Sequence, residues 1–207
     1  MARTGEDVRQ AFAGGTRAAI LSLEGADPLG RRAEAIRSFF QRGVRSLIFA
    51  WEENAFSGTA MGRNLPLTPQ GRRLLGLCEE LGVVVDVSHL SDAAFDEVAE
   101  LSEKPFVATH SNCRAICPSP RNLTDQQIRA IADRGGVVGI NLCPSFLDPS
   151  SLAVIGRIRQ ATNARGGTER ERSASRKQLS GLPRPSLGWV TRHIRHAMDV
   201  GGEDCVG

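Results

Sequence analysis

The chain has 207 residues, of which 41% are hydrophobic and 24% are charged, a balance that excludes a disordered chain and suits one folded domain with a substantial core. Aromatic residues make up 5% of the sequence and tyrosine is absent, which disfavours a stacking surface for nucleic acids. The net charge of +3 comes from the segment 157–186, where eight basic residues accompany two acidic ones, so it says little about the partner of the remaining body. Because that segment lacks aromatic residues for stacking, we expect no nucleic-acid partner.

Short apolar runs alternate with longer amphipathic stretches from residue 18 to the C-terminus. Most of the runs are apolar on successive residues, as expected for parallel strands that are covered on both faces. In chain order we predict strand 18–23, helix 31–42, strand 46–50, helix 70–81, strand 83–87, helix 92–101, strand 106–109, helix 124–134, strand 136–141, helix 188–200 and an incipient strand at 205–207.

Capping residues and glycines mark the ends of these helices. Thr68, Ser91 and Thr124 suit the N-cap position, and Pro69 suits the first helical position. A glycine suited to the left-handed conformation follows three of the helices: Gly43, Gly82 and Gly135. Repeated βα units of this kind predict an α/β fold with a parallel sheet, either open or closed into a barrel.

The segment 157–186 interrupts this alternation, since it is rich in Arg, Gly, Ser and Thr and has Pro183 and Pro185 near its end. We interpret it as a flexible basic insertion, because few apolar residues could anchor it. Residues 1–207 are otherwise expected to form one domain, a partial β/α barrel.

The cysteines are odd in number and include no C-x-x-C pair: Cys78, Cys113, Cys117, Cys143 and Cys205. This pattern indicates reduced thiols and a cytoplasmic protein. Residues 1–15 are polar and no run approaches 18 apolar residues, so we expect neither a signal peptide nor a membrane span in this chain.

Polar residues end three of the predicted strands. Glu24 follows the first strand, His89 the third and His110 the fourth. Because active sites of parallel β/α folds lie at the carboxyl ends of the strands, these side chains are expected to converge. Two imidazoles and a carboxylate are a common ligand set for catalytic zinc. Each residue alone has a structural alternative, but the set favours a metal site.

Four further residues have open or weaker interpretations. Asp86 suits a partner of the metal ligands and a satisfied core carboxylate equally well. Arg121, in the loop after the His110 strand, suits a bidentate carboxylate clamp or an ordinary surface arginine. His193 and His196 lie among arginines on a predicted helix, which favours a solvated face.

Five strings occur in an order and spacing that resemble the membrane (renal) dipeptidase family, especially its bacterial members: Leu23-Glu24-Gly25, Leu67-Thr68-Pro69-Gln70-Gly71, Asp86-Val87-Ser88-His89-Leu90-Ser91, Thr109-His110-Ser111-Asn112 and Arg121-Asn122-Leu123. The resemblance covers nearly the whole chain apart from the segment 157–186. No one string would suffice, but five in sequence are specific.

The resemblance implies a (β/α)8 hydrolase of the TIM-barrel type with two zinc ions, which cleaves dipeptides and accepts a D-residue at the C-terminal position. Glu24 matches the glutamate that bridges the two metals in the family, and His89 and His110 match the histidines of the second metal. Arg121 matches the arginine that binds the carboxylate of the substrate. A metal-bound hydroxide then attacks the scissile carbonyl, which the metal polarises.

The sequence also departs from the family pattern. The His-x-Asp pair of the first barrel strand is absent, and the Gly-x-Asp-Phe-Asp-Gly string of the last strand is not reached. Trp51 stands where animal members have a substrate-facing histidine. We count five to six of eight βα units, so we expect a chain truncated at both ends with one plausible zinc site.

An unclosed parallel sheet leaves its edges exposed, which favours association, for example as a homodimer. The main hypothesis is a zinc-dependent dipeptidase. The alternative is a catalytically inactive barrel fragment that binds a metal, a peptide or a partner subunit.

Overall fold

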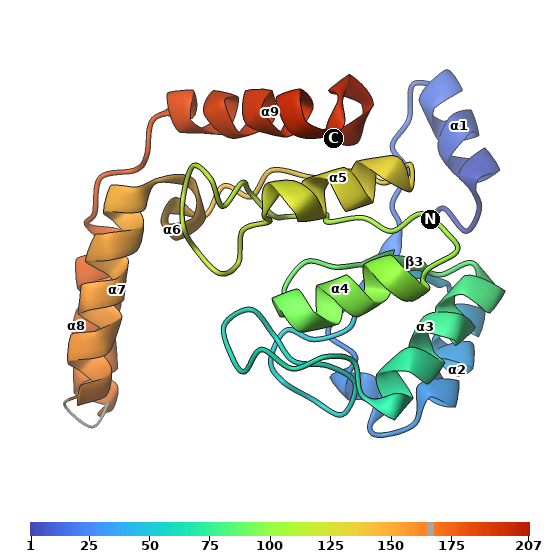
Figure 1. The fold of residues 1–207 in the computed structure, drawn as a ribbon, viewed down its shortest axis with the longest axis horizontal. Coiled ribbons are helices and arrows are strands. Elements are labelled where there is room, and N and C mark those ends of the chain that lie inside the picture. Colours follow the sequence, from blue (N-terminus) through green and yellow to red (C-terminus); the bar gives the residue numbers. More distant parts are fainter. Residues whose placement is uncertain (165–167) are drawn as a thin grey trace.

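This computed structural model describes residues 1–164 and 168–207 (Figure 1). Three parallel strands form the regular part of its sheet. The strands are β1 (Leu21–Glu24), β2 (Val44–Ile48) and β3 (Val84–Asp86), in that spatial order. The predicted strands 18–23, 46–50 and 83–87 therefore exist, each shorter than expected or displaced by one to three residues.

Isolated parallel bridges continue the sheet beyond β3. They join Asp86 to Val107, Ala108 to Val138 and Val138 to Val206. The predicted strands 106–109, 136–141 and 205–207 thus take their expected places in order, although each forms single bridges instead of a full strand. The result is an α/β fold with a partial, barrel-like parallel sheet, which confirms the predicted fold class.

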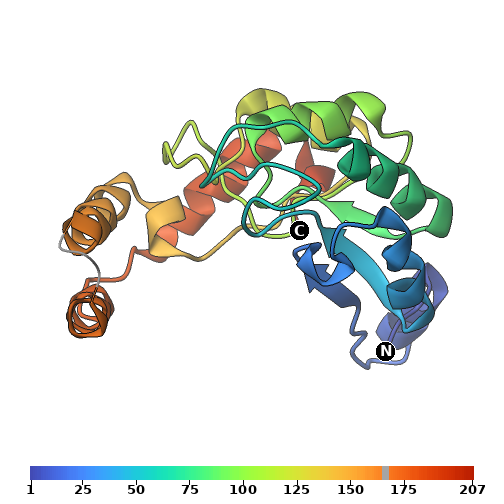
Figure 2. The same ribbon diagram turned by 90° about the horizontal axis from the view of Figure 1, so that it is seen from below.

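Helices follow the strands and cover the sheet. Figure 2 shows α3, α4 and α5 side by side along one side of the sheet. The helices are α1 (Gly5–Ala13), α2 (Ile36–Gln41), α3 (Pro69–Leu81), α4 (Asp92–Leu101), α5 (Asp125–Asp133), α6 (Pro144–Leu147), α7 (Pro149–Ala164), α8 (Glu169–Ser180) and α9 (Leu187–Gly201), with short 3₁₀ turns at Asp27–Leu29, Ala33–Ala35 and Glu203–Cys205. Among the described residues, no helix has the length and apolar character needed to cross a membrane.

The predicted caps are present. The hydroxyls of Thr68, Ser91 and Thr124 accept hydrogen bonds from the backbone at the starts of α3, α4 and α5, and Thr124 forms a reciprocal capping box with Gln127. The glycines expected in the left-handed conformation all have positive φ: Gly43, Gly82 and Gly135. Local side-chain chemistry therefore sets the boundaries of the helices that the sequence located best.

The segment 157–186 differs from the irregular insertion that the sequence suggested, because its described residues include the end of α7 and all of α8. Thr168 and Glu171 form a capping box at the start of α8, and Glu169 pairs with Arg172 and Arg176. These local interactions support a helix that the composition concealed. Helices α7 and α8 lie side by side and project from the body (Figures 1 and 2). Residues 165–167 of this segment lie outside the described residues.

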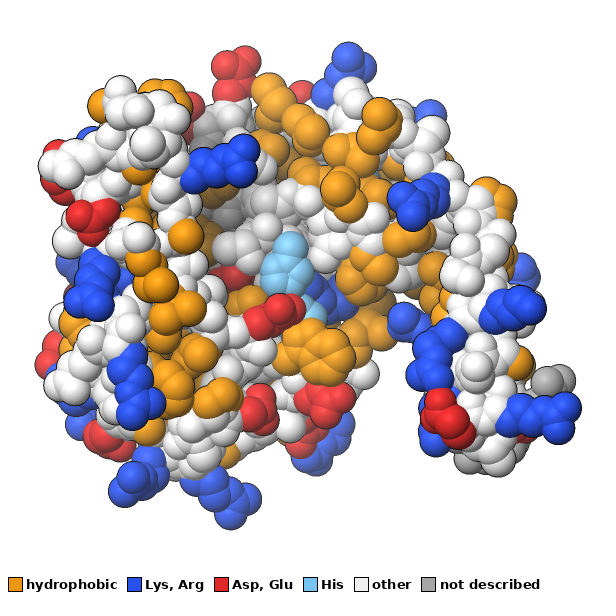
Figure 3. Space-filling model, turned by 180° about the vertical axis from the view of Figure 1, so that it is seen from behind, with side chains coloured by type: hydrophobic (Ala, Val, Ile, Leu, Met, Phe, Trp, Pro, Cys, Tyr) orange, Lys and Arg blue, Asp and Glu red, His pale blue; other side chains and the backbone are white. Residues whose placement is uncertain are grey.

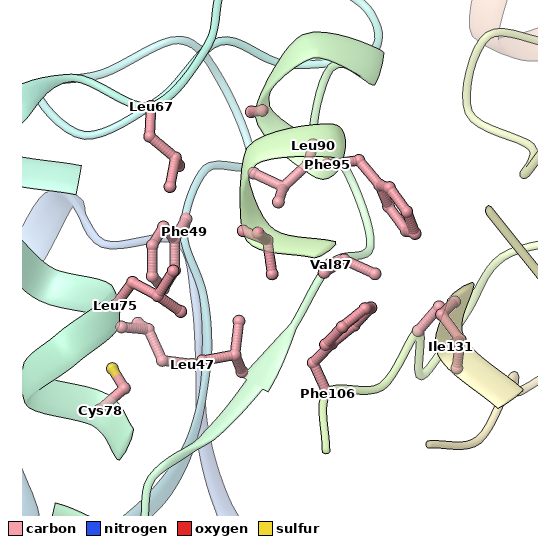
Figure 4. Packing of buried hydrophobic residues seen from close by; sticks show 14 of the residues in the cluster. Leu47, Phe49, Leu67, Leu75, Cys78, Val87, Leu90, Phe95, Phe106 and Ile131 are labelled. Atoms are coloured by element: carbon pink, nitrogen blue, oxygen red, sulfur yellow. The ribbon is translucent and has the colours of Figure 1, made fainter. Parts of the chain in front are cut away.

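The hydrophobic core lies between the sheet and the helices (Figure 4). Leu47 and Phe49 from β2 and the loop after it pack toward Leu75 of α3 (Figure 4). Phe95 of α4 meets Phe106 edge to face, with ring centroids 5.9 Å apart. This packing fixes the positions from which the strand ends emerge.

Substituting Gly71 by alanine should destabilise the fold. Gly71 lies in the first turn of α3, where an added Cβ would come within 2.1 Å of the Phe56 carbonyl oxygen. Because backbone must move to relieve this overlap, we expect Gly71→Ala to lower the free energy of unfolding by roughly 1–3 kcal/mol. Gly76→Ala in the same helix is the matched control, since it meets nothing within 4 Å and should stabilise by about 0.5–1 kcal/mol. Urea unfolding measures both; equal effects would contradict the close approach.

Candidate metal centre

Glu24, His89 and His110 meet at the carboxyl edge of the sheet, as the sequence predicted. The Nε2 atoms of the two histidines are 2.9 Å apart, and Glu24 Oε1 lies 3.3 Å from His89 Nε2 and 3.6 Å from His110 Nε2. Figure 3 shows histidine beside acidic and basic side chains at a hollow on this face.

The donor set and its spacing fit a metal ion. All three ligand atoms lie within 4.8 Å of one another. Two ligands of a tetrahedral zinc, each at about 2.0–2.1 Å from the ion, are separated by about 3.3 Å, and the observed separations bracket that value. Two nitrogen donors and one carboxylate leave a coordination position open, which is typical of a catalytic site.

His89 owes its orientation to an unusual backbone conformation. Its φ of 76° is the only positive value of a non-glycine residue among the described residues. For a residue with a bulky side chain, a left-handed backbone conformation costs of order 1 kcal/mol. Residues held in this conformation cluster at functional sites. The turn directs the imidazole from the end of β3 toward Glu24 and His110.

Both imidazoles are held in the neutral form that binds metals. Burial lowers the pKa of His89 from its ordinary 6.5 to about 3, and the Arg121 cation adds to the effect. Burial and Arg121 also lower the pKa of His110, against the attraction of Asp86 and Glu24. A neutral imidazole keeps a lone pair for a ligand bond.

Arg121 lies beside the three donors and is only 4% exposed. Its guanidinium donates to Ser111 Oγ at 3.3 Å and to the His110 carbonyl oxygen at 3.2 Å, while Nε has no partner among the described residues. Burial lowers its pKa to about 10, which leaves it a cation at neutral pH. A buried cation with an unused N–H group suits an incoming carboxylate. The interpretation of Arg121 as an ordinary surface arginine is therefore wrong.

A pocket of about 490 Å³ opens next to His89 and Arg121. Its apolar walls come from Trp51, Met61 and Phe146. Trp51 is 52% exposed, and its ring centroid lies 6.0 Å from that of His89. The pocket therefore joins the donor cluster and the cation to an apolar surface.

Asp86 is buried and fully engaged. It accepts a hydrogen bond from the backbone N–H of Ser88 at 2.9 Å and contacts Thr109, the residue before His110. The sequence did not single out Thr109, because neighbours on a strand point to opposite faces. Thr109 directly precedes a strand-end histidine and lies on the strand next to that of Asp86, and this position could have marked it as a partner of both.

His193 is not on a solvated face, so that prediction is wrong. It is fully buried on α9, where Nδ1 accepts from the Cys113 backbone N–H and Nε2 contacts the Leu147 carbonyl oxygen at 3.0 Å. His196 pairs with Asp125 at 2.8 Å. Packing of α9 against α5 and α6, which the local sequence does not reveal, gives both histidines structural roles.

Comparison with known proteins identifies the family of this chain. A family model described as membrane dipeptidase, peptidase family M19, matches residues 1–207. The chain belongs to this family. The resemblance drawn from the five sequence strings is thereby confirmed.

Relatives and solved structures agree with the assignment. An uncharacterized protein from the pqqA 5′ region of Klebsiella pneumoniae is 37% identical over 91% of this chain and 62% of its own length. A metallopeptidase of Rhodobacter sphaeroides, liganded with a phosphinate mimic of L-Ala-D-Ala, is 34% identical with a TM-score of 0.79 over 100% of this chain and 53% of its own. The probable dipeptidase PvdM of Pseudomonas aeruginosa is 28% identical with a TM-score of 0.88 over 100% of this chain and 60% of its own. The M19 chain thus spans 53% to 62% of the lengths of these proteins.

The metal-free protein should lose stability as the pH falls below 6.5. His89 takes up a proton near pH 6.5 when unfolded but only near pH 3 when folded, so the unfolded state binds more protons between these values. Each such histidine contributes up to about 1.4 kcal/mol per pH unit. Urea unfolding at pH 7, 6 and 5 measures the slope. His89→Asn should reduce the slope of unfolding free energy against pH by the contribution of one histidine. An unchanged slope would show that folded His89 titrates normally.

Proposed function

We propose that this M19 chain carries the metal-binding and carboxylate-binding part of a zinc-dependent dipeptidase, whose substrates include dipeptides with a C-terminal D-residue. The observation that carries the proposal is the cluster of Glu24, His89 and His110 donors with the Arg121 cation at its border. Membership of the family supports it, as does the L-Ala-D-Ala mimic bound to the Rhodobacter relative.

Glu24, His89 and His110 would hold the metal. A zinc ion held there would polarise a peptide carbonyl and would lower the pKa of a water molecule, which would supply hydroxide as the nucleophile at neutral pH. The Glu24 side chain is 56% exposed, as the bridging role that the family resemblance implies would require, while the described residues supply one donor cluster. The two histidines are more enclosed and would anchor one ion only.

Arg121 would bind the substrate's terminal carboxylate and thereby place the scissile bond. Its buried guanidinium is fixed by Ser111 and the His110 backbone, so little side-chain freedom is lost on binding. A salt bridge formed in a pocket with little water is stronger than one at the surface. Because Arg121 also contacts the residue that supplies one metal donor, the carboxylate and the metal would be held at a fixed separation.

The neighbouring pocket fits the size of the proposed substrate. Its volume of about 490 Å³ lies within the range of roughly 300–1,000 Å³ common for small-ligand sites. Trp51, Met61 and Phe146 offer apolar surface to a substrate side chain.

We also propose that the protein acts in the cytoplasm and as a homodimer. All five cysteines are free thiols, as in a reducing compartment. Ile20 and Leu21, at the β1 edge of the sheet, are 56% and 39% exposed, which favours a covering partner. Analytical ultracentrifugation tests the dimer directly.

Zinc should stabilise the protein through these three donors. At a free zinc concentration 100 times the Kd, we expect the free energy of unfolding to rise by about 2.7 kcal/mol. Glu24→Gln, His89→Asn and His110→Asn should each reduce or abolish this gain, because a ligand is lost. His196→Asn is the control, since His196 pairs with Asp125 away from the cluster. Calorimetric unfolding with and without zinc checks the prediction; a gain that survives all three substitutions would place the metal elsewhere.

Hydrolysis of L-Ala-D-Ala by the zinc-loaded chain tests the function itself. Glu24→Gln should abolish turnover. Arg121→Lys should raise KM by roughly 10- to 100-fold with a smaller change in kcat, because a lysine cannot replace a bidentate guanidinium worth about 1.5–3 kcal/mol per charged hydrogen bond. The control Arg37→Lys alters an exposed pair with Glu80 and should change neither constant.

The same assay separates the two hypotheses. A dipeptide amide lacks the terminal carboxylate, so the wild type should prefer the free acid and Arg121→Lys should lose that preference. Bound zinc without any turnover would instead favour the alternative, a fragment that binds a metal, a peptide or a partner without catalysis.

A further inference from the structure

A short chain of hydrogen bonds runs from the buried Asp86 to the imidazole of His110. Asp86 is 1% exposed, and its Oδ1 accepts the backbone N–H of Ser88 at 2.9 Å and of Thr109 at 3.2 Å. The Thr109 hydroxyl contacts Asp86 Oδ2 on one side and His110 Nδ1, at 2.9 Å, on the other. The far end of the imidazole, Nε2, faces Glu24 and His89.

The proton count along this chain gives it a direction. A threonine hydroxyl has one proton to donate and lone pairs to accept, whereas a carboxylate only accepts. The Thr109 proton therefore goes to Asp86, and the Thr109 oxygen must accept from His110 Nδ1. A neutral imidazole that carries its proton on Nδ1 has its lone pair on Nε2.

We propose that Thr109 and Asp86 are positioning residues, which hold His110 in the Nδ1–H tautomer with Nε2 available as a metal ligand. The metal-binding part of this inference rests on the proposed function, while the tautomer is a property of the metal-free protein. Partners behind a ligating histidine commonly change metal affinity by 10- to 100-fold.

The backbone holds Thr109 in place for this role. Its N–H is bonded to Asp86, and its carbonyl oxygen lies against Gly139, where a Cβ would come within 2.1 Å. Gly139 also accepts the Ser111 N–H, so the strand segments on both sides of Thr109 fix its position. The two metal-binding histidines thus differ in how they are held. His89 is aimed by its left-handed backbone and His110 by a side-chain relay.

Substitutions at Thr109 test the relay. Thr109→Val keeps the shape of the side chain but removes the hydroxyl that contacts Asp86 and His110. We expect zinc affinity, measured by competition with a chelating dye, to fall by 10- to 100-fold. Thr109→Ser restores the hydroxyl and should bind zinc within about threefold of the wild type, since the same hydrogen bonds can form.

Asp86→Asn reverses the direction of the relay. The new amide N–H₂ donates to the Thr109 oxygen, so the Thr109 proton turns to His110 Nδ1 and favours the Nε2–H tautomer, which blocks the ligand atom. We expect an affinity loss at least as large as that of Thr109→Val. Asp148→Asn is the matched control, because Asp148 is 8% exposed and accepts from Ser150 and Ser151 far along the chain from the cluster.

Nitrogen-15 NMR of the histidine rings in the metal-free protein reads the tautomer directly. The wild type and Thr109→Ser should show His110 with its proton on Nδ1, and Asp86→Asn should show it on Nε2. Wild-type affinity in Thr109→Val, or an unchanged tautomer in Asp86→Asn, would overturn the inference. If the wild type binds no zinc, the proposed function fails, and the tautomers of the wild type and Asp86→Asn still decide the relay.

Discussion

Parallel backbone pairing is the constraint on which the rest of this M19 chain depends. The strands β1 to β3 and the bridges that follow them run in one direction, so all of their carboxyl ends open at the same edge. Glu24, His89 and His110 are distant in sequence and meet only because of this arrangement. Register matters equally, since a slip of one residue would turn a strand-end side chain to the opposite face. Close backbone contact at Gly139 leaves little room for such a slip.

The electrostatics of the centre combine two neutral imidazoles with a buried cation. Burial and the Arg121 charge both disfavour protonated histidine, so the groups that stabilise the neutral ligand form are built into the pocket. At His110, the charges of Asp86 and Glu24 oppose that effect, and the same two charges raise the pKa of Arg121 against the effect of its burial. A metal cation would meet neutral imidazoles and the Glu24 carboxylate. An anionic carboxylate would meet the Arg121 cation on the adjoining side of the same pocket.

Local chemistry made much of the fold and site predictable from the sequence. Caps such as Thr68 and Thr124 act within one helical turn, and the βα rhythm places strand-end residues together whatever the details of packing. What the sequence hid depends on contacts between distant segments. The burial of His193 follows from its contacts with Cys113 and Leu147, which are distant in the chain. Nothing in the local sequence marks the left-handed backbone of His89. Helix α8 was missed for a different reason, since its overall composition resembles a linker while its capping box and ion pairs favour a helix.

The topology of the sheet also bears on how the chain folds. Each pairing joins segments separated by a whole crossover, as between Leu21 and Val44 or between Val138 and Val206. Non-local contacts of this kind slow folding, because loop-closure entropy is lost before the contacts form. The three candidate donors Glu24, His89 and His110 lie at or before residue 110, so the part of the chain that carries them does not include the Val138–Val206 pairing. Because those donors come from three separate βα units, any ligand that binds all three of them would stabilise the folded sheet against unfolding of each unit.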